Sequence, residues 1–156
     1  MLTKNLTAEQ AESAREQLRI ADEIESISDY LISILKSNLK LKNDGFEIPA
    51  EIQAGFQEIH RQTIDQFESI QKAYEGRRHD RVFLQNIYAG CRKLTGQIKE
   101  LRSKFMTEMS EERYDPLIIV AVNSQLNFYR RLWEHQQNIV EAFCSQKVGR
   151  EKGISP

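Results

Sequence analysis

The chain has 156 residues, of which 29% are charged and 40% are hydrophobic, a composition typical of one water-soluble domain. Its 22 basic and 23 acidic residues nearly cancel, which argues against nucleic acid as the main partner, because nucleic-acid binders usually carry a basic excess. The longest wholly apolar run, from Leu117 to Val122, is far shorter than the roughly twenty residues that cross a bilayer. We therefore expect a single domain over residues 1–156, with no membrane span and no nucleic-acid partner.

Only 7 glycines and 3 prolines interrupt the chain, so long helices are expected. The first helix is predicted over residues 8–41. Thr7 is its expected N-cap, and Gln10 lies three residues later, where it can complete a capping box. One apolar stripe, spaced by alternating steps of four and three residues, predicts the face that this helix buries. Its members are Ile20, Ile24, Ile27, Leu31 and Ile34.

Three further helices are predicted, over residues 49–76, 80–109 and 115–144. Asp80 and Asp115 are suited to be the N-caps of the last two. No segment alternates apolar and polar residues with a period of two, so no strand is expected. Because the predicted connections are short, consecutive helices are expected to be antiparallel neighbours. The sequence thus predicts an all-α protein, an antiparallel up-down-up-down bundle of four long helices.

A second face of the first helix carries a stripe of carboxylates. Asp22, Glu25 and Asp29 stand at positions i, i+3 and i+7, so their side chains lie one above another on the helix surface. Oxygen ligands of this kind suit metal cations, and an acidic stripe also suits a basic partner. The alternative is a solvated face on which the carboxylates pair with neighbouring basic residues such as Arg19. The spacing alone leaves these alternatives open.

Motifs that would indicate catalysis are missing from the sequence. There is no glycine-rich phosphate loop, no nucleophile elbow and no Cys–His arrangement within one motif. The Glu-x-x-His signature of dinuclear carboxylate sites is also absent, since Gln57, Gly76 and Leu132 precede the three histidines at that spacing. We therefore expect a protein that is not an enzyme.

The segment from Leu18 to Ile34 resembles the PhoU family of phosphate-transport regulators. That family carries a helical Glu-x-x-x-Asp motif, usually Glu-Arg-Ile-Gly-Asp, and Glu25, Ile27 and Asp29 match it. The surrounding residues are most similar to the PhoU-like domain at the C-terminus of bacterial sodium/phosphate cotransporters. The resemblance implies a PhoU-like helical fold.

The last predicted helix resembles the second copy of this motif. His135 and Asn138 fall at family positions, whereas Arg130 and Glu134 replace the acidic pair. In the family such carboxylates hold metal clusters, so the resemblance implies a transition metal, iron or zinc, on the first helix. The ligands that it implies are Asp22, Glu25 and Asp29, with His135 and Glu134 as weaker candidates.

The resemblance also implies a function and a location. It predicts a non-enzymatic regulatory or interaction domain linked to phosphate transport, forming the cytoplasmic tail of a sodium-dependent phosphate symporter at the inner face of a bacterial membrane. Under this hypothesis the chain is a fragment of a larger membrane transporter. Its partners are then the transmembrane domain of that transporter and a second copy of the chain in a dimer. Two alternatives stay open: a metal-binding bundle that uses the acidic stripe, and a plain scaffold that oligomerises.

Overall fold

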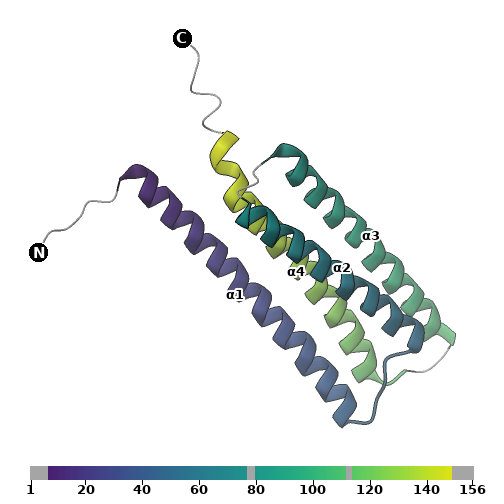
Figure 1. Ribbon diagram of the computed structural model, residues 1–156. Helices are drawn as coiled ribbons and strands as arrows, with labels where there is room; N and C mark the ends of the chain where they lie inside the picture. The colour runs from purple at the N-terminus through teal and green to yellow at the C-terminus, as the bar shows by residue number, and fades with distance from the viewer. Residues whose placement is uncertain (1–6, 77–79, 112–113, 149–156) are drawn as a thin grey trace, which may run out of the picture.

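The computed structural model describes residues 7–76, 80–111 and 114–148, which form long α-helices joined by short connections (Figure 1). Successive helices run in opposite directions, and no strand occurs in these described residues. The all-α, up-down-up-down bundle is therefore confirmed, and each helix end lies within four residues of its predicted position. The helices are α1 (Ala8–Asn43), α2 (Ala50–Glu75), α3 (Arg81–Glu111) and α4 (Pro116–Val148).

Local hydrogen bonds fix where the helices begin. The capping box of α1 forms as predicted: the Gln10 N–H donates to Thr7 Oγ1 at 3.2 Å, and the Thr7 N–H donates to Gln10 Oε1 at 3.0 Å. Asp80 caps α3, because its Oδ1 accepts from the N–H of Phe83 at 2.7 Å. After α1, Gly45 has a φ of 76°, a left-handed conformation that glycine adopts without steric cost.

The central helix of the bundle is α4. It packs against α1, α2 and α3, whereas α1 packs against α4 alone and has no Cα atom within 8 Å of α2 in the described residues. The expectation that consecutive helices are neighbours is thus wrong for α1 and α2. The reason lies in α4, which over residues 116–144 is exposed only at Pro116, Val120, Asn127 and Arg131, so that three helices pack around its buried residues. These residues are Ile118, Ala121, Val122, Gln125, Leu126, Tyr129, Leu132, Trp133, Gln136, Ile139, Val140, Ala142, Phe143 and Cys144.

The stripe that α1 buries is rotated from the predicted one. Ile24 and Leu31, two of its predicted members, remain exposed. Glu23 and Tyr30 lie against α4 in their place, through contacts with His135 and other residues of that helix. Steps of three and four residues along these positions are those of a coiled-coil seam. The buried members of the seam are Ile20, Ile27, Ile34 and Leu41.

A chain of buried polar side chains joins α2 to α4. Trp133 Nε1 donates to Thr63 Oγ1 at 2.8 Å, and Gln136 Nε2 donates to the Thr63 carbonyl oxygen at 3.1 Å. Gln66 Nε2 in turn donates to Gln136 Oε1 at 3.0 Å. Since buried polar groups are costly unless they are hydrogen bonded, these contacts fix the register of α2 against α4. On α3, a Cβ added at Gly90 would lie 2.8 Å from Gln66 Oε1 and 3.1 Å from Trp133 Cζ3.

Candidate functional site

The predicted acidic stripe lies on the surface of α1. Asp22, Glu25 and Asp29 are all exposed, on the side of the helix away from the seam. Within the described residues, none of these three carboxylates forms an ion pair. Arg19, the expected intrahelical partner, instead has its Nη2 3.9 Å from Glu141 Oε2 on α4. The stripe is therefore solvated, but the expected pairs within the helix are not formed.

A metal site on this stripe would need ligands beyond the three carboxylates. Among residues 7–76, 80–111 and 114–148, no group of three or more His, Cys, Asp or Glu side chains could hold a metal ion. Helical spacing places Asp22, Glu25 and Asp29 along a line rather than around a common point. Binding of iron or zinc there stays a prediction, without support from the described part of the chain.

Glu23 on α1, an acidic residue that the sequence did not single out, makes specific contacts with α4. Its Oε2 lies 2.6 Å from His135 Nδ1, and Asn138 Nδ2 donates to its two carboxylate oxygens at 3.1 and 3.2 Å. The ring centroids of Tyr30 and His135 are 5.5 Å apart. Only 16% of the Glu23 side chain and 21% of the His135 side chain are exposed, so this cluster lies within the α1–α4 contact. The sequence contained a signal for this cluster, because Glu23 and Tyr30 are seven residues apart and therefore lie on the same face of α1.

His135 and Glu134, the two weaker ligand candidates, have different partners. His135 contacts α1, whereas Glu134 is bound within α4. The Nη1 atoms of Arg130 and Arg131 each donate to Glu134 at 2.8 Å. Arg130, which stands where the family has an acidic residue, is therefore paired with Glu134, and among the described residues the two ligand candidates have different hydrogen-bond partners.

A second histidine contact joins α2 to α4. Tyr129 Oη lies 3.1 Å from Nδ1 of His60, which is otherwise exposed. Burial raises the pKa of Tyr129 to about 12, so the phenol stays protonated at neutral pH. The contact therefore joins a protonated phenol to an imidazole at the edge of the core.

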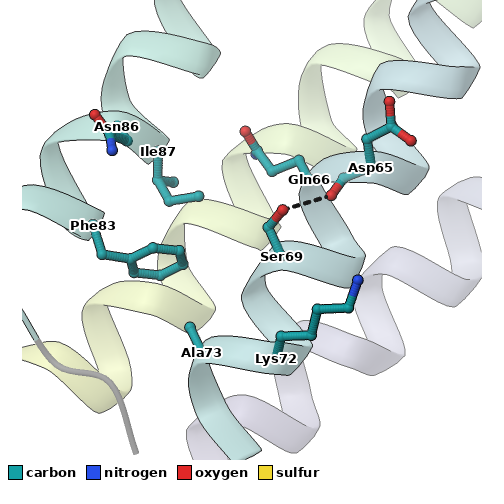
Figure 2. A pocket seen from close by; sticks show the side chains of 8 residues that line it. All are labelled: Asp65, Gln66, Ser69, Lys72, Ala73, Phe83, Asn86 and Ile87. Carbon is teal, nitrogen blue, oxygen red and sulfur yellow. Dashed lines mark hydrogen bonds between the residues drawn. The ribbon is translucent and has the colours of Figure 1, made fainter. Parts of the chain in front are cut away.

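An open pocket of about 570 Å³ lies between α2 and α3, as Figure 2 shows. Phe83 and Ile87 line it from α3, and Gln66, Ser69 and Asp65 line it from α2. The Ser69 hydroxyl donates to the Asp65 carbonyl oxygen at 2.9 Å, and the Gln66 amide is hydrogen bonded in the core. These polar groups of the pocket wall are hydrogen bonded within the chain.

An uncovered apolar surface runs along α1. Because α1 packs against α4 alone, five large aliphatic side chains beside the seam stay in contact with solvent. The rotation of about 100° per residue gathers them into one stripe, which lies between the seam and the acidic stripe. We call this stripe the outer face of α1. It consists of Ile24 (44% exposed), Leu31 (39%), Ile32 (47%), Leu35 (61%) and Leu39 (57%).

None of the described helices is long and apolar enough to cross a membrane. Comparisons with protein families, with curated proteins and with solved structures find no match for this chain. The resemblance to PhoU therefore stays a prediction, carried by the residues from Leu18 to Ile34 and by those on α4.

Proposed function

We propose that this chain is an interaction domain that regulates phosphate transport by binding a membrane transporter. The observation that carries the proposal is the uncovered outer face of α1. Apolar surfaces of this kind, rimmed by charged residues, commonly mark protein–protein contacts. A helix that packs against a single neighbour has room for such a contact along its whole length.

The link to phosphate transport rests on the resemblance to PhoU. Its motif residues Glu25, Ile27 and Asp29 lie on α1, the helix that also carries the outer face. Ile27 is buried in the seam with α4, whereas Glu25 and Asp29 are exposed beside the outer face. The exposed part of the motif is thus accessible to a partner. We infer that this partner is a sodium-dependent phosphate symporter, contacted at its cytoplasmic side.

The mechanism that follows is regulation by contact between surfaces. Binding that favours one conformation of the symporter over another changes the rate of uptake by changing the populations of the two states. The chain would supply a rigid surface for this purpose, because its helices are long and its core polar groups are largely satisfied.

Vesicle binding tests the proposal. The purified full chain is immobilised and incubated with proteoliposomes that contain a bacterial sodium/phosphate symporter from the same organism. Proteoliposomes of the same lipids without the symporter are the control. We expect retention of the symporter vesicles alone, and a changed rate of sodium-driven phosphate uptake when the chain is added to their cytoplasmic side. Equal retention of both kinds of vesicle, with the chain shown to be helical by circular dichroism, would contradict the proposal.

A further inference from the structure

We propose that the outer face of α1 binds the same face of a second copy, so that two chains form a two-fold symmetric dimer with antiparallel α1 helices. This inference rests on the proposed function only in treating α1 as the docking helix. It names a second copy as the occupant of the outer face in the free chain, so the symporter and the second copy compete for that face.

The charges of α1 are divided between its two halves. From Ala8 to Asp29 the helix carries seven acidic and two basic residues, and from Tyr30 to Asn43 it carries three lysines and no acidic residue. Two antiparallel copies place each acidic half beside the basic half of the other helix, whereas two parallel copies place like charges together. Charge complementarity therefore favours a copy of the same helix as the partner, in the antiparallel direction.

Four exposed charges of α1 lie along one side of the outer face. Asp22 and Glu25 lie there in the first half of α1, and Lys36 and Lys40 continue the same line in the second half. Within the described residues, none of these four side chains forms an ion pair inside its own chain. A two-fold axis perpendicular to two antiparallel helices brings the charged sides of both copies to the same edge of the contact. The lysines of one copy then meet the carboxylates of the other.

One register satisfies both the apolar and the charged stripes. When Leu31 lies opposite Ile32 of the second copy, Leu35 lies opposite Ser28, and Leu39 lies opposite Ile24. The two lysines then lie opposite the two carboxylates. At 1.5 Å per residue this apolar contact is about 22 Å long, which is short for a stable interface. We therefore expect a dissociation constant on the order of micromolar.

Sedimentation equilibrium of the purified full chain tests the dimer. We expect the apparent mass to rise from 18.2 kDa towards twice that value as the concentration increases. Leu31→Ser/Leu35→Ser should weaken association roughly a hundredfold, because each substitution removes apolar area from both copies. Val82→Ser/Met106→Ser is the matched control, since these α3 side chains are 60% and 54% exposed and lie outside the outer face. It should leave association unchanged.

Charge swaps test the complementarity. Lys36→Glu/Lys40→Glu makes the line of charges acidic throughout, and Asp22→Lys/Glu25→Lys makes it mainly basic. Each variant alone should associate about tenfold more weakly than the wild type, because like charges then face each other. An equimolar mixture of the two should form a heterodimer more tightly than either variant pairs with itself, and added salt should weaken that heterodimer.

Cysteine cross-linking tests the direction of the helices. In the antiparallel register, mild oxidation should link Ser28→Cys to Leu35→Cys when the two variants are mixed, and should link neither variant to itself. Parallel helices would give the opposite result, since each new cysteine would then face its own copy. Oxidation of the wild-type chain controls for Cys91 and Cys144.

The outcomes separate this inference from the proposed function. A chain that stays monomeric at high micromolar concentration overturns the dimer, and so does association that Leu31→Ser/Leu35→Ser leaves unchanged. If a monomeric chain binds symporter vesicles and loses that binding in the same variant, the symporter occupies the outer face and the dimer is refuted. A dimer that does not bind symporter vesicles refutes the proposed function alone.

Discussion

Replacing Thr63 with valine should destabilise the bundle although it hardly changes the volume of the side chain. The Thr63 hydroxyl is buried between α2 and α4, where it accepts a hydrogen bond from Trp133 Nε1 at 2.8 Å. It also donates to the Ile59 carbonyl oxygen at 2.7 Å. Valine keeps the branched shape but has no oxygen, so the indole N–H of the buried Trp133 loses its partner.

The size of the effect follows from that unpaired donor. A buried donor left without a partner costs about 1–3 kcal/mol, and the substitution leaves no cavity that would add to this. We therefore expect Thr63→Val to lower the free energy of unfolding by about 1–3 kcal/mol. For a domain of this size, each kcal/mol corresponds to a fall in Tm of about 2–4 °C.

Urea unfolding measures this change. Far-UV circular dichroism follows the helices, and fluorescence follows the site itself, because Trp133 is the single tryptophan of the chain. Thr95→Val is the matched control: the Thr95 hydroxyl also donates to a carbonyl oxygen one turn earlier, at 2.9 Å, but this residue is exposed on α3. The control should change the free energy of unfolding by less than about 0.5 kcal/mol.

A double-mutant cycle isolates the hydrogen bond from other effects of the substitution. Trp133→Phe removes the N–H donor, so in that background Thr63→Val should cost about 1 kcal/mol less than in the wild type. An equal cost in both backgrounds would refute the reasoning. So would a loss of stability no larger than that of Thr95→Val.

Three further predictions concern α1, α3 and alkaline pH. Glu23→Ala should lower the free energy of unfolding, measured in urea, by about 1–3 kcal/mol, because His135 and Asn138 lose their hydrogen-bond acceptor. The control Glu25→Ala removes an exposed carboxylate and should change this free energy by less than about 0.5 kcal/mol. Gly90→Ala should lower the free energy of unfolding by about 1–3 kcal/mol in thermal unfolding, because the added Cβ would lie 2.8 Å from Gln66 Oε1 in the core. Gly96→Ala is the control: its Cβ would point into open space, and the substitution should raise the free energy of unfolding by about 0.5–1 kcal/mol. The folded-state pKa of Tyr129, about 12, lies above the value of about 10 expected in the unfolded chain. The stability contributed by its protonated phenol is therefore complete below about pH 10 and is lost as the pH rises towards 12, and Tyr129→Phe should reduce that loss in urea titrations across this range.

Helix boundaries were predictable because local chemistry determines them. The capping box at Thr7 and Gln10 involves residues three positions apart, and the Asp80 cap binds the N–H of Phe83 within the first turn of α3. Which helices touch is a different matter, since it depends on groups far apart in the chain. The extensive apolar surface of α4 determines which helices touch, because α1 packs against α4 and not against α2 in the described residues.

The buried side of α1 was the hardest feature to predict. Two overlapping stripes share Ile20, Ile27 and Ile34; one also contains Ile24 and Leu31, and the other contains Glu23 and Tyr30. Counting apolar residues favours the first stripe, but the structure buries the second, because His135 and the aromatic rings of α4 provide partners for a carboxylate and a phenol. A single helix cannot reveal this preference, since the chemistry that sets it lies on the other helix.

The same rotation explains why α1 has two different apolar surfaces. Leu35 and Leu39 keep most of their side-chain surface in water. If α1 had only to pack against α4, polar residues at these two positions would therefore be equally suitable. Leaving large aliphatic groups in water contributes little to the stability of this chain, whereas covering them on association contributes roughly in proportion to the apolar area removed from water. The seam, with its largely buried glutamate Glu23, holds α1 to α4 in one specific rotation. That rotation directs the remaining leucines and isoleucines outwards, beside a line of charges that is acidic at one end and basic at the other. Because of this combination, α1 is suited to bind a second helix of the same sequence.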